Sequence, residues 1–239
     1  MSNRDLNVLN RVKNFVQCGR VVKSNPPTTS SFICSNSIGI SKILNLVNGH
    51  MRLKVYNFQI ACESLGIEFI PANYTIERDS AYLAGLIDTD GSIVFNFPGN
   101  RIELNLEFRN YKESNILDLS EVIEGGNCKK LELTKTNQDE GKIFMSVRYS
   151  YNTVKNMMPI YNYVKNNPLH CSFKLARCMK IKEFMNIRKY NKASWDSIEY
   201  QIYSDFVLDW ISYLNPNWKN IPFVKKLNPS KIYSNEPVQ

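Results

Sequence analysis

The stretch Leu83-Ala84-Gly85-Leu86-Ile87-Asp88-Thr89-Asp90-Gly91 decides the fold of this chain. Its pattern predicts a helix from about Ser80 to Asp90, with Ser80 as the N-cap. Small or short side chains share one face of this helix, so a second helix can approach closely: Ala81, Ala84, Gly85 and Asp88. The carboxylate of Asp90 falls at the C-terminal end, where the helix dipole disfavours a bare negative charge. A divalent cation removes this cost, and Asp90 with the unpaired helix-end carbonyls supplies hard oxygen ligands suited to Mg²⁺.

Two strands are predicted directly after this helix, over Ser92–Phe97 and Arg101–Asn110, joined across Pro98-Gly99-Asn100. The second strand alternates strictly between apolar and polar side chains, which is typical of a strand with one buried face. Its apolar set is predicted to face the core: Ile102, Leu104, Leu106 and Phe108. Its polar set is predicted to face outward: Arg101, Glu103, Asn105, Glu107 and Arg109.

An internal repeat organises the rest of the chain. The predicted helix that starts at Asn7 resembles a second one over about Asn115–Ile123. Each is followed by a basic strand, over Arg20–Lys23 in the first case and Lys129–Leu133 in the second. The next strand and helix also correspond: Phe32–Ser35 with Met145–Tyr149, and Ile40–Val47 with Val154–Tyr161. The chain's only two histidines then take equivalent places, because His50 stands four residues before Lys54 and His170 four before Lys174. Each pair opens a further helix.

The repeat predicts a division into two half-domains of unequal length. Residues 1–72 form an incomplete first half, 73–227 a complete second half, and 228–239 a tail. The segment Ile70–Tyr74 reads as the linker between the halves. The first half lacks the helix and two strands that open the second. A helix around Tyr200–Tyr213 is predicted to pack into the core through Trp210 and Tyr213.

The stretch Leu83–Gly91 resembles the signature of the LAGLIDADG family of homing endonucleases and intron maturases, and departs from it only at Thr89. The segment Val47–Lys54 also resembles the inter-repeat segment of mitochondrial intron-encoded members, so the resemblance covers roughly residues 4 to 190. The family resemblance implies an α+β fold with αββαββα order in each half. It also implies a pseudo-two-fold axis at the motif helices and antiparallel sheets shaped as a saddle over DNA.

Carried over residue by residue, the resemblance makes Asp90 the metal-binding carboxylate and Gly91 its backbone neighbour. Two-metal hydrolysis needs carboxylates from two such helices. Lys54 and Lys174 match, less closely, the region where the family keeps a basic residue beside the active site, although simple helix N-termini explain them equally well. His50 and His170 receive no role from the family, and capping or packing is the expectation for them.

The same resemblance makes the outward strand residues a base-reading face. Arginine suits guanine edges and asparagine adenine edges. The predicted nucleic-acid-binding set is Asn96, Arg101, Glu103, Asn105, Arg109, Lys130, Ser146 and Arg148. Glu103 and Glu107 are unfavourable beside phosphates, so this face is either selective or no longer used on DNA. A merely soluble sheet face is the alternative interpretation.

Charge and composition agree with a polyanionic partner. Thirty Lys and Arg against 22 Asp and Glu give a net charge of +8. No apolar run approaches the roughly 20 residues that a bilayer span needs, so a soluble protein is expected. The six cysteines lack CxxC spacing and are expected to be reduced interior thiols. With 29 Asn against 6 Ala and no import presequence, the composition favours an AT-rich organelle genome and hence a mitochondrial protein, although AT-rich bacteria and viruses share this skew.

Two functions from different classes are consistent with these features. One is an intron-encoded endonuclease that binds long duplex DNA and hydrolyses phosphodiester bonds with Mg²⁺, with or without maturase activity. A single motif carboxylate makes catalysis depend on completion by a second polypeptide, by self-association or by a longer reading frame. The other is a non-catalytic RNA-binding protein, such as a splicing maturase or a mitoribosome component that binds intron RNA or rRNA.

Overall fold

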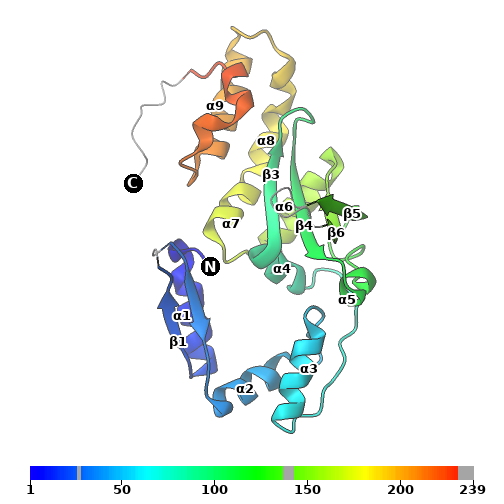
Figure 1. Ribbon diagram of the computed structural model, residues 1–239. Coiled ribbons are helices and arrows are strands. Elements are labelled where there is room, and N and C mark those ends of the chain that lie inside the picture. Colours follow the sequence, from blue (N-terminus) through cyan, green and yellow to red (C-terminus); the bar gives the residue numbers. More distant parts are fainter. Residues whose placement is uncertain (26–27, 137–142, 231–239) are drawn as a thin grey trace.

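The computed structural model describes residues 1–25, 28–136 and 143–230. It shows an α+β fold in two parts, connected by an extended linker that runs along one side of the molecule (Figure 1). Across the described segments, none of the helices combines the length and apolar character that a membrane span requires.

The larger part contains the predicted αββαββα order. Its elements are α4 (Tyr82–Asp90), β3 (Gly91–Asn96), β4 (Arg101–Arg109), α5 (Lys112–Ile116), β5 (Lys129–Thr136), β6 (Ile143–Tyr151) and α6 (Val154–Asn166). The four strands form an antiparallel sheet in the order β3-β4-β6-β5. The fold class and the element order predicted for this half are therefore confirmed.

The core of this part lies between the sheet and the helices. The apolar set of β4 is buried as predicted: Ile102, Leu104, Leu106 and Phe108. Three further helices complete the layer: α7 (Ser172–Met179), α8 (Ile181–Ile187) and α9 (Ile198–Ser212). Trp210 is buried on α9 as predicted, but the prediction for Tyr213 was wrong. Tyr213 follows the last helical residue and is 41% exposed, because the chain turns away from the helix there.

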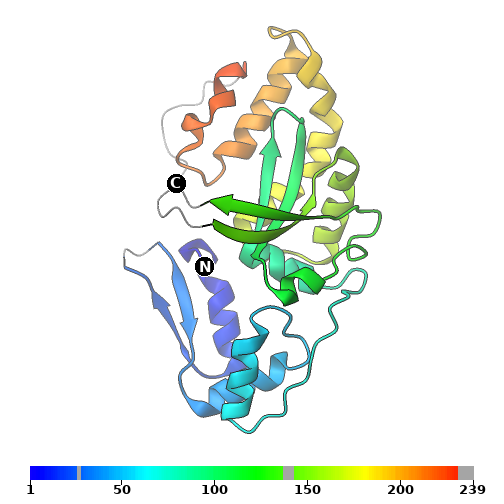
Figure 2. The same cartoon turned by 45° about the vertical axis from the view of Figure 1, so that its right-hand side comes forward.

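The smaller part holds a 3-10 turn (Asn3–Asp5), then α1 (Leu6–Val16), β1 (Arg20–Lys23), β2 (Ser30–Ile33), α2 (Ser37–Val47) and α3 (Val55–Ser64). Its sheet has two antiparallel strands in the described residues, and its core is a small cluster around Leu44, Phe58 and Cys62. Within the described residues, the larger part therefore carries a four-stranded sheet and the smaller part a two-stranded one (Figure 2). The smaller sheet provides only part of the saddle that the resemblance implies.

The repeat is also visible in hydrogen-bond register. In the smaller part, the Asn3 N–H donates to the Thr28 carbonyl at 3.3 Å, next to the antiparallel bridge between Ser2 and Thr29. In the larger part, the Asn110 N–H donates to the Met145 carbonyl at 2.9 Å. Asn3 thus takes the place of Asn110, and residues 1–3 pair with residues 28–30 at the start of β2, as the end of β4 pairs with β6.

One predicted helix was wrong. The helix expected over Asn115–Ile123 ends at Ile116, where α5 stops. The next residues turn toward the linker, because the Asp118 N–H donates to the Tyr74 carbonyl at 2.9 Å and its carbonyl accepts the Ile76 N–H at 3.1 Å. The apolar side chains beyond Ile116 still enter the core, which explains the helix-like spacing: Leu117, Leu119, Val122 and Ile123.

Ile76, just after the linker, belongs to the core of the larger part. The predicted boundary at residue 72 lies four residues earlier and stays a prediction. The predicted tail, residues 228–239, falls mostly outside the described residues, since the structure describes it only to residue 230.

Candidate catalytic and nucleic-acid-binding site

The N-terminal end of α4 is anchored by a tyrosine from α6. The Tyr163 hydroxyl donates to the Ser80 carbonyl at 2.6 Å and accepts the Ala84 N–H at 2.9 Å. Tyr163 is 3% exposed, and burial raises the pKa of its hydroxyl. The predicted N-cap, Ser80, accepts the Tyr82 N–H through its side chain at 3.4 Å. Tyr163 therefore satisfies one of the N–H groups that a helix start leaves unpaired, a role for which no sequence pattern provided a signal.

The C-terminal end of α4 meets the N-terminus of α7. The Lys174 ammonium donates to the carbonyls of Ile87 and Asp88 at 2.7 and 2.9 Å. In return, the Asp88 carboxylate accepts the N–H groups of His170 and Cys171 at 2.8 and 2.9 Å. A cation at a helix C-terminus and a carboxylate at an N-terminus both complement the helix dipoles. The two helix ends therefore cap each other, and this contact fixes where α4 ends.

Asp90 is the last residue of α4, and its side chain is exposed. Ser92, two residues on, is exposed and pairs with Asn105, so β3 presents its polar side just after Asp90. Gly91 is buried, and a Cβ there would come within 2.6 Å of the Ile87 Cα. Gly91 is thus required by close packing, which lets β3 start directly beside the end of α4.

The oxygen atoms at this helix end only partly match the predicted metal ligands. Lys174 occupies the carbonyls of Ile87 and Asp88, so they are not open to a cation. The Asp90 carboxylate faces solvent. Mg²⁺ keeps several waters and typically takes one or two protein carboxylates together with substrate phosphates. Asp90 therefore fits an Mg²⁺ ion held jointly by water and a phosphate. Within the described residues, no cluster of three or more His, Cys, Asp or Glu side chains forms a complete metal cage.

Lys54, the predicted counterpart of Lys174, has a different environment. It is exposed and stands at the N-cap of α3. Two residues earlier, the Arg52 guanidinium lies 4.4 Å from the ring of Tyr82, which begins α4. Lys54 therefore lies near the opposite end of α4 from Asp90, and the structure does not bring the two together.

The smaller part reaches the same helix junction through Asp5. Its carboxylate accepts the Ser172 N–H at 3.0 Å, next to the N–H groups that Asp88 binds. Asp5 is 6% exposed. A second contact joins the parts nearby, from the Arg4 guanidinium to the Leu214 carbonyl at 3.2 Å. Sequence reasoning missed Asp5, although an acidic residue just before a predicted helix was a visible signal.

The outer face of the four-stranded sheet follows from strand register, because directly paired residues share a face. Glu107 pairs with Arg148, which pairs with Leu131. Asn105 pairs with Ser150, which pairs with Lys129. We call this surface the outer face; its polar members are Ser92, Asn96, Arg101, Glu103, Asn105, Glu107, Arg109, Lys129, Lys135, Ser146, Arg148 and Ser150. Lys129 and Lys135 were not predicted.

Glu107 is the centre of an ionic cluster on the outer face. It accepts hydrogen bonds from Lys135, from the Ser146 hydroxyl at 2.7 Å, and from Arg148 Nε and Nη2 at 3.2 and 2.8 Å. Partial burial raises the pKa of Glu107, but the hydrogen bonds from these three partners outweigh burial and lower it to about 2. Glu103 is bound similarly, by Arg101 at 2.7 Å and by Asn96 at 2.8 Å. Both Glu103 and Glu107 are thus paired with basic or amide side chains of the outer face.

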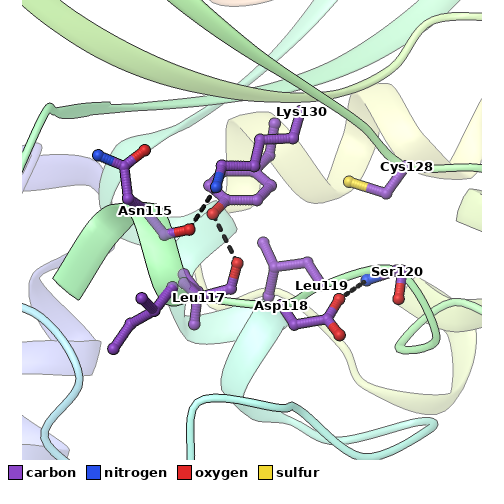
Figure 3. Close-up of a pocket in the computed structure, with 9 residues that line it drawn as sticks. Asn115, Leu117, Asp118, Leu119, Ser120, Cys128 and Lys130 are labelled. Atoms are coloured by element: carbon purple, nitrogen blue, oxygen red, sulfur yellow. Dashed lines mark hydrogen bonds between the residues drawn. The ribbon is translucent and has the colours of Figure 1, made fainter. Parts of the chain in front are cut away.

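Two predicted nucleic-acid-binding residues need correction. Lys130 pairs with Tyr149, whose hydroxyl bonds the carbonyls of Ser114 and Leu117, so both point to the inner side of the sheet. Its ammonium binds the Asn115 carbonyl at the rim of a pocket of about 270 Å³ (Figure 3). The prediction placed Lys130 on the wrong face, because the register of β5 with β6 puts its neighbour Lys129, opposite Ser150, on the outer face instead. Ser146 lies on the outer face as predicted, but it is 3% exposed beneath Glu107.

The remaining predicted residues lie on the outer face: Asn96, Arg101, Glu103, Asn105, Arg109 and Arg148. Arg109 is exposed and stacks 5.2 Å above the Tyr111 ring. His50 and His170 are both exposed, and the main-chain N–H of His170 takes part in the Asp88 contact.

Comparisons with known proteins agree with the motif. The chain is 26% identical over 188 residues to a protein of Dictyostelium discoideum named intron-encoded DNA endonuclease ai2b, a match that covers 77% of this chain and 69% of the relative. No protein-family model matches.

Two solved structures align with most of this chain. The LAGLIDADG homing endonuclease I-GzeII in complex with its DNA target has a TM-score of 0.47 and 12% identity, covering 87% of this chain and 85% of that one. The meganuclease I-SmaMI, bound to uncleavable DNA, has a TM-score of 0.42 and 14% identity, covering 97% and 85%. The motif at Leu83–Gly91 and the similarity to an intron-encoded endonuclease together support the assignment of this chain to the LAGLIDADG homing endonuclease family.

Proposed function

We propose that this protein is an intron-encoded endonuclease of an organelle, which binds duplex DNA against the outer face and cleaves it beside Asp90. One observation carries the proposal: Asp90 is exposed at the end of α4, two residues before Ser92, the first residue of β3 on the outer face. A nucleic acid lying on the outer face therefore passes next to this carboxylate. The net charge of +8 and the name of the Dictyostelium relative support a DNA partner.

The residues of this site have different proposed roles. Asp90 is the acidic ligand, and Mg²⁺, when bound there with a phosphate, would neutralise charge on the reacting phosphodiester and lower the pKa of a bound water. Lys174 and Asp88 hold the helix end in place, so Lys174 acts as a positioning residue. Arg109 and Lys129 supply positive charge on the outer face, where phosphate contacts give most of the affinity. Lys54 has no part in this site.

Cleavage of both DNA strands needs a carboxylate beside each scissile phosphate, and we propose that a second polypeptide supplies the second one, whereas Asp90 alone supports nicking of one strand. Two surfaces of the described chain fit such a segment. Gly85 is exposed in the middle of α4, and a Cβ there would meet no atom within 4 Å, which leaves room for a closely packed helix. The edge of β2 beyond Ser30 corresponds to the edge of β6 that pairs with β4.

Two adjacent lysines provide a matched test of DNA binding. Lys129 lies on the outer face and Lys130 on the inner side of the same strand. Replacing Lys129 with Gln should weaken binding to duplex DNA several-fold at low salt and reduce the slope of log affinity against log salt by about one. Lys130→Gln should leave both unchanged. Equal effects of the two substitutions would contradict DNA binding by the outer face.

The second candidate is a non-catalytic RNA-binding protein, such as a splicing maturase. The pairing of Glu107 with Lys135 and Arg148 motivates this candidate, because it partly neutralises two cations that the outer face would otherwise offer to DNA phosphates. Binding of the same variants to structured intron RNA and to duplex DNA of equal length separates the two functions. Tighter RNA binding that depends on Lys129, without DNA cleavage, would support the RNA-binding function.

A further inference from the structure

Two cysteines of the smaller part meet at the base of its hairpin. Cys18 lies between α1 and β1, and Cys34 follows β2 directly. Their sulfur atoms are 3.4 Å apart, and both residues are free thiols of intermediate exposure. A disulfide needs a sulfur separation of about 2.05 Å, so closing the bond requires a movement of little more than an ångström.

The first turn of α2 is shaped around this pair. A Cβ at Gly39 would clash with both sulfur atoms, because it would lie far inside their van der Waals contact distance, so only glycine leaves them the space they occupy. Gly39 is buried, and its N–H is held by the Asn36 side chain at 2.7 Å, which caps α2. The two thiols therefore approach each other in a fixed recess between the hairpin and α2.

We propose that Cys18 and Cys34 form a reversible dithiol–disulfide site that fixes the β1–β2 hairpin when the protein meets a disulfide oxidant such as oxidised glutathione. One thiolate attacks a glutathione sulfur, and the S–S bond of glutathione breaks, so that one glutathione leaves and is protonated. The second cysteine then attacks the mixed disulfide and releases the other glutathione. The two protein thiols are oxidised, and one glutathione disulfide is reduced to two thiols.

The surroundings favour slow exchange at neutral pH. Partial burial, and next the hydrogen bond with Cys34, raise the pKa of Cys18, whereas the nearby Lys42 ammonium lowers it. Because the thiolate is the attacking species, the reaction should speed up as the pH rises through the mildly alkaline range. The hairpin that the disulfide closes carries exposed basic side chains, Arg20 and Lys23. This site is independent of Asp90 and of the proposed nuclease function.

The test uses the full-length chain, incubated with oxidised or with reduced glutathione. After oxidation, non-reducing trypsin digestion should yield one linked species that joins residues 14–20 to residues 24–42. Amide exchange in β1 and β2 should slow, and the melting temperature of the smaller part should rise by about 5 °C or more. Reduction with a dithiol should reverse each effect.

Matched variants separate this pair from the other thiols. Cys18→Ser and Cys34→Ser should each abolish the linked species and instead retain one glutathione on the remaining cysteine. Cys128→Ser should leave the linkage intact. Gly39→Ala, whose methyl would separate the sulfurs, should slow linkage at least tenfold. Absence of the Cys18–Cys34 linkage in the folded wild type, or a linkage that leaves hairpin exchange unchanged, would overturn the proposal.

Discussion

Lys174 and Asp88 each bind the end of the other's helix. The Lys174 ammonium donates to the Asp88 carbonyl at 2.9 Å. The Asp88 carboxylate accepts the N–H of Cys171, the residue just before the helix that carries Lys174, at 2.9 Å. This exchange joins the C-terminus of α4 to the N-terminus of α7. It holds Asp90, two residues beyond Asp88 and the last residue of α4, at a defined position just before β3. The junction is thus the structural basis of the proposed catalytic carboxylate.

Removing the Lys174 ammonium should loosen this junction. Lys174→Met retains most of the aliphatic stem but leaves two helix-end carbonyls without their donor. We expect a loss of about 1.5 to 3 kcal/mol in the free energy of unfolding, the range for hydrogen bonds to charged groups. Urea denaturation followed by circular dichroism measures it. Lys54→Met is the control and should change stability by less than about 0.5 kcal/mol, because Lys54 is exposed. Equal losses in the two variants would contradict the positioning role.

Tyr163 should stabilise the opposite end of α4. Tyr163→Phe removes both the donor to the Ser80 carbonyl and the acceptor of the Ala84 N–H in a buried site. The expected cost is about 1 to 3 kcal/mol, with faster amide exchange at Ala84 in particular. Tyr161→Phe, on the same helix and only partly buried, should cost less than half as much. If Ala84 exchanges at the wild-type rate in Tyr163→Phe, the anchoring contact does not operate in solution.

Asp5 should couple the two parts of the molecule. Asp5→Ala leaves the Ser172 N–H at the start of α7 without its acceptor. We expect a cost of about 1 kcal/mol, as for the loss of a helix-capping side chain, and faster exchange in α1 and α7 together. Asp196→Ala removes an exposed carboxylate elsewhere and should have no such effect. Faster exchange in α1 alone would show that the parts are not coupled through this contact.

Glu107 should make stability depend on pH in the acid range. Its pKa is lowered from 4.5 to about 2, so its ionic cluster contributes stability above the unfolded value and loses it as the pH falls toward about 2. Glu107→Gln should therefore be less stable than the wild type at neutral pH. The difference should shrink as the pH drops from about 5 to about 2. Parallel urea titrations across this range measure it, and a difference that does not change with pH would contradict the assigned cluster.

The sequence was sufficient to predict the larger half, because a nine-residue motif and a strictly alternating strand fix a helix, a strand and the buried face of β4. It failed where long-range contacts decide the outcome. The helix expected over Asn115–Ile123 was interrupted because the linker at Tyr74–Ile76 hydrogen-bonds to Asp118. Lys130 was assigned to the wrong face because face depends on register with β6, which the pattern of β5 alone does not reveal.

The candidate site was predicted in part. Asp90 and Lys174 were both identified, but the motif could not show that Lys174 binds the helix-end carbonyls that were expected to remain open to Mg²⁺. Asp5 and Tyr163 were missed, since each acts on a main-chain group more than 75 residues away in the sequence. Partners so distant in sequence leave no local pattern.

Cleavage of duplex DNA by the wild type and by Asp90→Asn tests the central claim most directly. The substrate is DNA that carries the joined exon sequences flanking this reading frame, incubated with Mg²⁺, and DNA affinity is measured in parallel to show that Asp90→Asn still binds. We predict Mg²⁺-dependent nicking by the wild type and a loss of at least about 100-fold in Asp90→Asn at unchanged affinity. Equal nicking by both proteins would contradict the role of Asp90, and no nicking by either would contradict the endonuclease function.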